Sequence, residues 1–205
     1  MKTITYSSLD STNNEAKRLL ENEEAENGLC IIAQEQTTGR GTQGREWVSP
    51  KGAGLYLSFV HIPDTSIQVT ENLWTMATAV ACYETLKSQF DINIDIKPVN
   101  DLYIDNKKLG GILTESGLRD DLIQYIITGI GINIYNTQRT LVNSKVWPIS
   151  LEEVVSPHAL ARYNPEDFSN HLRKRVDFWY NKAYKMESAY IKESYSKRII
   201  SENQK

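Results

Sequence analysis

The chain has 205 residues, of which 40% are hydrophobic and 24% are charged, as in ordinary globular domains. Its formal net charge of -3 provides no overall attraction to nucleic acid or to an anionic membrane, so any affinity for phosphate must be local. Residues 1–6 lack the apolar core of a signal peptide, and no run approaches membrane-spanning length. We therefore expect a cytoplasmic protein with no nucleic-acid and no membrane partner.

The two cysteines, Cys30 and Cys82, lie in apolar segments and do not form a C-x-x-C pair. The three histidines are scattered at positions 61, 158 and 171. This pattern argues against a zinc site and is typical of a reducing compartment. We expect no metal bound by protein ligands alone.

The first half of the chain alternates helix and strand signals. Thr12 and Glu15 have the spacing of a capping box and predict a helix start. A short apolar run at residues 29–33 predicts a buried strand, and residues 36–54, with five glycines, predict a long loop. Residues 55–60 alternate as a strand does, and residues 73–90 carry apolar side chains at helical spacing.

The second half predicts a run of strands followed by helices. Residues 92–97, 101–104 and 108–115 are expected strands, with a hairpin turn at Asp105-Asn106, and residues 122–134 form another. Helices are expected to begin at Ser150 and at Asn164-Pro165, with one or two helices over 166–195. The order favours an α/β (α+β) fold with a mixed, largely antiparallel sheet flanked by helices, rather than a doubly wound parallel sheet.

Three segments have residue types suited to a ligand. In residues 39–47, glycines let backbone N–H groups approach a ligand, and Arg40 and Arg45 suit phosphate or carboxylate. The glycine spacing matches neither a Walker loop nor a dinucleotide fingerprint, and a mobile surface loop would have the same composition. Lys97 and Asn100-Asp101, followed by Lys108 and paired glycines, place a cation at a strand end, although surface lysines on a hairpin would look alike.

The third segment is residues 129–134, where Asn133 interrupts an apolar strand. A buried amide must be hydrogen-bonded, either by a ligand or by neighbouring backbone. Together with the first two segments, the pattern favours a ligand.

In this order, the segments resemble the catalytic domain of biotin protein ligases of the monofunctional type, which have no DNA-binding domain. The resemblance covers residues 8–135 and rests on Asp10-Ser11-Thr12-Asn13, Gln36, Gly39-Arg40-Gly41, Trp47, Ser49-Pro50, residues 52–58, Asn100-Asp101-Leu102, residues 108–113 and Gly131-Ile132-Asn133. It implies a sheet related to class II aminoacyl-tRNA synthetases and one catalytic domain over residues 1–205. The small C-terminal β-domain of many relatives is expected to be absent or truncated.

The resemblance also implies the chemistry. ATP and Mg²⁺ would convert biotin to biotinyl-5'-AMP, which is then transferred to a lysine of a biotin carboxyl carrier protein; a homodimer is a further implication. Arg40 and Lys97 would be catalytic. The implied biotin-binding residues are Ser11, Thr12, Asn13, Gln36, Gly39, Arg40, Gly41, Thr42, Lys108 and Gly111. The implied nucleotide-binding residues are Arg45, Trp47, Asn100 and Asn133.

The chain departs from this family at two places. Pro98-Val99 stands where relatives usually have Trp-Pro, and biases Lys97 toward extended backbone. Thr42-Gln43 replaces a basic pair in the loop, which predicts weaker retention of the adenylate. A faster adenylate off-rate than in an arginine-bearing loop variant is the expected sign.

Other functions fit parts of the pattern. A lipoate ligase needs the same lysine and glycine-rich loop, but a dithiolane ring has less need of polar contacts than a ureido ring. An octanoyl transferase needs a nucleophile, for which neither cysteine is well placed. A non-catalytic biotin-binding remnant and a nucleic-acid module are the remaining alternatives, the last opposed by the acidic composition.

Overall fold

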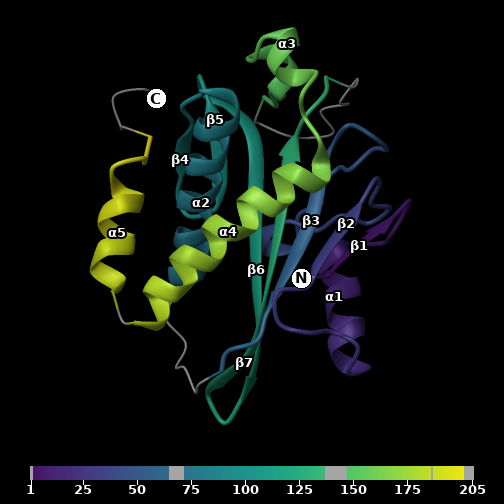
Figure 1. The fold of residues 1–205 in the computed structure, drawn as a ribbon, viewed down its shortest axis with the longest axis vertical. Helices are drawn as coiled ribbons and strands as arrows, with labels where there is room; N and C mark the ends of the chain where they lie inside the picture. Colours follow the sequence, from purple (N-terminus) through teal and green to yellow (C-terminus); the bar gives the residue numbers. More distant parts are fainter. Residues whose placement is uncertain (1, 65–71, 137–146, 186, 201–205) are drawn as a thin grey trace. The chain divides into compact units, whose positions relative to one another are not determined.

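The computed structural model describes residues 2–64, 72–136, 147–185 and 187–200. Its strands form a seven-stranded sheet in the order β1-β2-β3-β7-β6-β5-β4 (Figure 1). The β1–β2 pair is parallel, whereas the β2–β3, β4–β5 and β5–β6 pairs are antiparallel. The predicted mixed, largely antiparallel sheet with helices is therefore confirmed.

The chain divides into two compact units. Unit 1 contains Met1–Glu71 and Ile112–Gly131, and unit 2 contains Asn72–Gly111 and Ile132–Lys205. The long strands β6 (Lys107–Arg119) and β7 (Leu122–Asn133) have residues in both units.

Unit 1 is built from β1 (Thr3–Tyr6), α1 (Thr12–Glu21), β2 (Cys30–Ala33), the 3-10 turn η1 (Thr42–Gly44) and β3 (Gly54–His61), with parts of β6 and β7. All four residues of β2 are buried, as the apolar run predicts. The helix α1 packs its apolar side against the strands, and the shared core contains Ala16, Leu19, Leu29, Ile31, Val60 and Ile127. Burial of this side offsets the polar character of the rest of α1.

Unit 2 combines a strand hairpin with a group of helices. Its strands are β4 (Asp95–Lys97) and β5 (Asp101–Ile104) with the start of β6, and the hairpin turn has Asp105 and Asn106 at φ 48° and 61°. The helices are α2 (Leu73–Phe90), α3 (Pro157–Leu160), α4 (Pro165–Tyr184) and α5 (Ser188–Ser196), with a 3-10 turn η2 (Leu151–Glu153) before α3. Helices α2, α4 and α5 pack against one another (Figure 1).

Several local predictions are confirmed. The α2 boundaries match the predicted 73–90, and Asn164 caps α4 by accepting hydrogen bonds from the Glu166 and Asp167 N–H groups, with Pro165 in the first turn. Strand β4 is shorter than the predicted 92–97, and β6 extends beyond the predicted 108–115 to Arg119. Ser150 starts only the short turn η2, where its N–H and hydroxyl both donate to Glu153.

The predicted capping box of Thr12 and Glu15 is wrong. Ser11 is the N-cap residue, its side chain makes no capping hydrogen bond, and Thr12 is the first residue of α1. Glu15 accepts hydrogen bonds from the Tyr6 hydroxyl at 2.8 Å and from Arg18 Nε at 2.8 Å. These side-chain partners replace the backbone N–H that the motif would have used.

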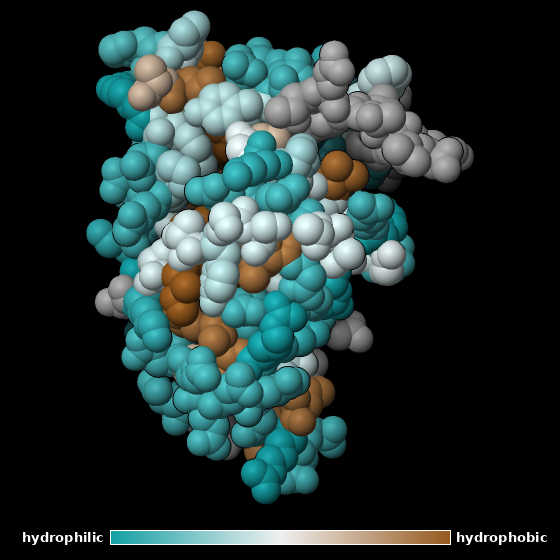
Figure 2. Space-filling view, turned by 90° about the vertical axis from the view of Figure 1, so that its right-hand side faces the viewer, coloured by the Kyte–Doolittle hydropathy of each residue, from teal (hydrophilic) through white to brown (hydrophobic). Residues whose placement is uncertain are grey.

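One face of the protein is mostly hydrophilic (Figure 2). Figure 2 shows hydrophobic residues in separate groups among hydrophilic ones on the face that it draws. In the described parts of the chain, no helix is both long and apolar enough to cross a membrane.

Candidate functional site

A cluster of hydroxyl and amide side chains is buried in unit 1, and we call it the hydroxyl–amide cluster. Its members are Thr12, Asn13, Gln36, Ser49 and Ser58. Thr12, Asn13, Ser49 and Ser58 are each at most 3% exposed. Polar groups at this depth must be hydrogen-bonded, and they bond partly to one another and partly to residues outside the cluster, as Asn13 Nδ2 does to Glu115.

Side chains from distant parts of the chain make these bonds. Gln36 Oε1 accepts from the Thr12 backbone N–H at 2.9 Å and from the Thr12 hydroxyl at 3.2 Å. Gln36 Nε2 donates to Ser49 Oγ at 2.8 Å. Ser58 Oγ lies 2.8 Å from Thr12 Oγ1 and 2.6 Å from Asn13 Oδ1. The cluster thus fixes the first turn of α1 relative to the loop and to β3.

Two glycines of β7 make room for side chains of unit 1. A Cβ on Gly129 would lie 2.4 Å from Asn13 Oδ1, and a Cβ on Gly131 would lie 2.5 Å from Trp47 Nε1. The Asn13 amide and the Trp47 indole therefore rest directly on the strand backbone. The strand continues through both glycines, so they accommodate packing and do not interrupt β7.

The glycine-rich loop is closed by its own backbone. The Trp47 N–H donates to Gly39 O at 2.9 Å, and the Gly41 N–H donates to Arg45 O at 2.7 Å. The Gly41 N–H is therefore hydrogen-bonded within the loop, and a contact of Gly41 with a ligand stays a prediction. Arg45 binds within the loop, through Nη2 to the Thr42 hydroxyl at 2.9 Å.

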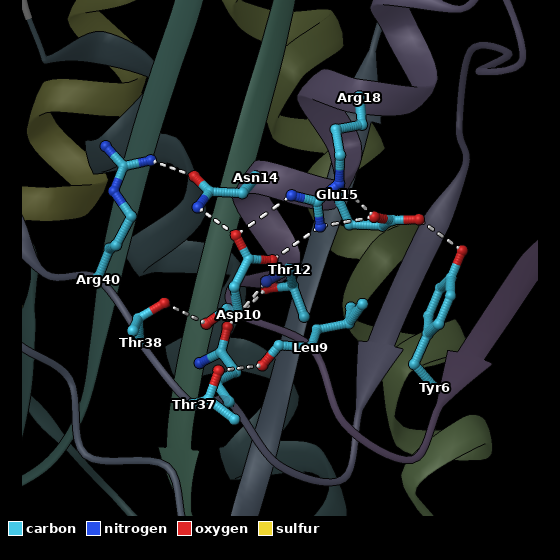
Figure 3. A network of polar contacts seen from close by, with 11 residues as sticks. Tyr6, Leu9, Asp10, Thr12, Asn14, Glu15, Arg18, Thr37, Thr38 and Arg40 are labelled. Carbon is cyan, nitrogen blue, oxygen red and sulfur yellow. Dashed lines mark hydrogen bonds and ion pairs between the residues drawn. The ribbon is translucent and has the colours of Figure 1, made fainter.

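Arg40 extends from the loop toward Asn14 of α1 (Figure 3) and also contacts Glu115 of β6. Its Nη1 donates to Asn14 Oδ1 at 2.8 Å, and its Nη2 donates to Glu115 Oε1 at 3.0 Å. Asn14 in turn donates to Asp10 Oδ2 at 2.8 Å. The pKa of Asp10 lies well below its ordinary value, chiefly because of the hydrogen bonds from Arg18.

The predicted site residues of unit 2 have different partners. Lys108 Nζ forms an ion pair with Asp101 Oδ1 at 2.7 Å, and both side chains are at most 21% exposed. The Lys97 ammonium lies 5.4 Å from the centre of the Tyr103 ring. Lys97 is the last residue of β4, in the extended backbone that Pro98 favours.

Asn133 also belongs to unit 2 and is 8% exposed. Its Nδ2 donates to the backbone carbonyls of Lys108 at 3.1 Å and Ile149 at 3.0 Å. Neighbouring backbone therefore satisfies the amide nitrogen, and burial of this amide does not require a ligand. A nucleotide contact by Asn133 stays a prediction.

The structure thus groups the predicted residues by unit. Unit 1 contains Ser11, Thr12, Asn13, Gln36, Gly39, Arg40, Gly41, Thr42, Arg45 and Trp47. Unit 2 contains Lys97, Asn100, Lys108, Gly111 and Asn133, with Asn100 in the turn between β4 and β5 and Gly111 paired with Asp101.

Three residues that make these contacts were not predicted from the sequence as site residues: Ser49, Ser58 and Glu115. Ser58 is a hydroxyl in the middle of the otherwise apolar strand β3, which is a signal for a buried hydrogen bond. Glu115 follows an apolar stretch of β6 and shares the side of the strand with Leu113. Its partners lie up to 102 residues away, and the sequence contains no signal for them.

Residues 6–133 match the sequence profile of the biotin/lipoate A/B protein ligase family. The match covers well over half of the chain, and the chain therefore belongs to this family.

The family members to which the chain is similar are larger proteins. It is 39% identical over 131 residues to the bifunctional ligase/repressor BirA of Bacillus subtilis, over 64% of this chain and 40% of that protein. It is 34% identical over 129 residues to the biotin–[acetyl-CoA-carboxylase] ligase of Paracoccus denitrificans, over 61% of this chain and 51% of that protein. The match therefore spans about half or less of these relatives.

The fold is similar to that of a biotin protein ligase from Aquifex aeolicus solved in complex with biotin and ATP. The two structures have a TM-score of 0.74 and 26% sequence identity, and the alignment covers 97% of this chain and 78% of that one. The predicted fold family is confirmed.

Proposed function

We propose that the chain is a biotin–protein ligase. It uses ATP to convert biotin to biotinyl-5'-AMP and transfers the biotinyl group to a lysine of a biotin carboxyl carrier protein. The observation that carries the proposal is the hydroxyl–amide cluster, found in a chain of this family. A ureido ring needs both donors and acceptors, and this cluster supplies both in a water-poor environment.

In this proposal the ring system of biotin binds at the first turn of α1 and at Gln36. The Ser11 hydroxyl makes no capping bond to the helix, and Gln36 Nε2 has a second hydrogen beyond the one given to Ser49. Thr12, Asn13 and the loop residues Gly39, Gly41 and Thr42 complete the proposed contacts. Lys108 and Gly111 of unit 2 stay predicted biotin contacts.

The first reaction step brings two anions together. A biotin carboxylate oxygen bonds to the α-phosphorus of ATP, and the bond from that phosphorus to the bridging oxygen breaks, releasing pyrophosphate. Arg40 and Lys97 are proposed to stabilise the charge on the phosphorus oxygens. Arg45, Trp47, Asn100 and Asn133 are proposed nucleotide contacts.

In the second step the amine of the carrier lysine attacks the acyl carbon of the adenylate. The bond from that carbon to the phosphate oxygen breaks, AMP leaves, and the amine loses a proton. No enzyme nucleophile takes part in this scheme. The carrier protein, a homodimer, a cytoplasmic location and a single catalytic domain over residues 1–205 are predictions within the same proposal.

Mg²⁺ is proposed only as a companion of ATP. Among the residues that the structure describes, no group of three or more His, Cys, Asp or Glu side chains could hold a metal ion. When bound, Mg²⁺ would neutralise phosphate charge through the phosphate oxygens. We assign it no protein ligand.

The test is biotin-dependent exchange of labelled pyrophosphate into ATP, with lipoate in place of biotin as the control. We expect exchange with biotin only, and a fall of about 100-fold in Lys97→Ala, since removing one charge that stabilises a transition state costs about that much. Lys107→Ala, a neighbouring exposed lysine in the β5–β6 hairpin, is the matched control. Exchange that requires lipoate would indicate a lipoate ligase, and biotin binding without exchange would indicate a non-catalytic binder.

A further inference from the structure

The carboxylate of Glu115 joins three separate segments of unit 1. It accepts hydrogen bonds from Asn13 Nδ2 at 2.7 Å and from Lys17 Nζ at 2.7 Å, both on α1. It also receives both terminal nitrogens of Arg40, Nη2 at 3.0 Å and Nη1 at 3.3 Å. We call these four residues the Glu115 cluster.

The Glu115 cluster has an excess of positive charge. Two cations, Lys17 and Arg40, face one carboxylate, so the group has a net charge of +1. The side chain of Glu115 is 19% exposed, and that of Arg40 is 40% exposed. Burial raises the pKa of Glu115, but the hydrogen bonds from Lys17 and Asn13 and the charge of Arg40 outweigh burial, so the pKa lies below its ordinary value. The carboxylate is therefore ionised at neutral pH.

Arg40 is anchored from two sides. Glu115 holds it with two parallel hydrogen bonds, and Asn14 Oδ1 accepts a third at 2.8 Å. A paired guanidinium of this kind loses less freedom on binding a ligand than an exposed arginine, because its rotamer is already fixed. These bonds use three of the five N–H groups of the guanidinium, so Nε and one Nη2 hydrogen can still bind an anion.

We infer that Glu115 is a positioning residue for the adenylation step. Its carboxylate holds the Arg40 guanidinium in the orientation needed to bind the anion formed from biotin and ATP, while the net positive charge of the cluster is retained. This inference rests on the proposed function for its effect on rate. The fixing of Arg40 by Glu115 is a property of the ligand-free protein and can be tested without any substrate.

The first experiment is limited trypsin digestion of the ligand-free protein, with cleavage sites mapped by mass spectrometry. Glu115→Gln keeps the shape of the side chain and removes its charge. We expect cleavage after Arg40 to become about tenfold faster, because the arginine loses its bidentate anchor. Glu84→Gln is the matched control, since Glu84 is 23% exposed and likewise pairs with an arginine, Arg175, in unit 2. Cleavage after Arg40 is expected to be unchanged in that control.

The second experiment is a double-mutant cycle on biotin-dependent pyrophosphate exchange. Glu115→Gln is expected to lower kcat/KM about tenfold when Arg40 is present, and less than twofold in an Arg40→Gln background. Glu115→Asp, which keeps the charge but shortens its reach, is expected to lie between wild type and Glu115→Gln. An unspecific structural defect would lower the rate by the same factor in both backgrounds, and a thermal melt verifies that each variant folds.

The outcomes of these experiments distinguish failure of the proposed function from failure of the inference about Glu115. Absence of exchange in wild type would overturn the proposed function, while the trypsin result would still decide whether Glu115 fixes Arg40. Equal cleavage in Glu115→Gln and wild type would overturn the inference, as would an equal loss of kcat/KM in both backgrounds.

Discussion

In unit 1, several predicted site residues hydrogen-bond to other polar side chains, whereas in unit 2 the predicted site residues contact backbone, one carboxylate or an aromatic ring. In unit 1, Gln36 and Ser58 each join two other polar side chains of the hydroxyl–amide cluster. In unit 2, Asn133 binds two carbonyls and Lys108 pairs with Asp101. Networks of side chains can exchange partners when a ligand arrives, while bonds to backbone mainly stabilise the fold. We therefore expect substitutions in unit 1 to change ligand binding and substitutions in unit 2 to change stability more strongly.

The largest expected effect is on stability, in unit 2. Asn133→Ala removes the donor from two backbone carbonyls in a buried place, which costs about 3 kcal/mol of unfolding free energy. Urea unfolding measures the loss, with Asn93→Ala at an exposed position as the control. If Asn133→Ala loses less than about 1 kcal/mol of unfolding free energy, the polar residues of unit 2 do not stabilise the fold more than those of unit 1.

Ser58→Ala tests whether the hydroxyl–amide cluster of unit 1 binds a ligand. The hydroxyl is fully buried and serves both Thr12 and Asn13, so its removal is expected to cost about 2 kcal/mol of unfolding free energy. Because the cluster is the proposed ureido site, the Kd for biotin in calorimetry should rise about tenfold. Ser196→Ala, on the exposed side of α5, is the control. Unchanged biotin affinity with lowered stability would make the cluster purely structural.

A pH series distinguishes a buried group of unit 1 from an exposed one of unit 2. Burial lowers the pKa of His61 to about 4, against an ordinary 6.5, and Asp64 opposes the shift only partly. The unfolded chain therefore binds the proton first, so the contribution of His61 is fully present above pH 6.5 and is lost as the pH falls toward 4. Between pH 7 and 4.5 the loss of unfolding free energy should be about 2.4 kcal/mol.

The pH effect is measured by urea unfolding of wild type and His61→Gln at both pH values. The variant should show the smaller change in unfolding free energy. His171→Gln, exposed on α4, serves as the control and should behave as wild type does. Parallel curves for all three proteins would contradict the assignment.

The smallest expected effect concerns ion pairs. Asp101→Asn removes the carboxylate charge that pairs with Lys108, at a place where both side chains are at most 21% exposed, and should cost about 1 kcal/mol of unfolding free energy. Glu193→Gln breaks a pair in which both side chains are more than 60% exposed, and should leave the free energy of unfolding nearly unchanged. If the two losses are equal, burial does not strengthen the unit 2 pair.

Elements with local signals were predicted well from the sequence. The span of α2, the strand Asp101–Ile104, the turn at Asp105-Asn106 and the cap at Asn164 each depend on residues a few positions apart. The capping box of Thr12 and Glu15 is the local prediction that failed, and it shows where prediction from local spacing stops working. Both side chains have partners outside the motif, and a spacing rule has no information about them.

The same limit applies to the candidate site. The family resemblance indicated Thr12, Gln36 and Arg40, but not that Thr12 and Gln36 bond to each other across 24 residues, or that Arg40 pairs with Glu115 across 75. The sequence around a single charged residue near the end of a strand does not indicate which distant residue it will pair with. The pair becomes visible only when the fold brings the two segments together. Residue types were therefore predictable, and the pairs that fix their geometry were not.

Both cysteines are deeply buried, and this makes site-specific chemistry on the protein straightforward. Cys30 is 2% exposed and Cys82 is fully buried, with burial raising the pKa of the Cys82 thiol. A thiol introduced by Val48→Cys, at a position 57% exposed in the glycine-rich loop, would be far more reactive toward a maleimide dye than either native cysteine. A single fluorophore could thus be attached to this loop without first removing a natural residue from the core.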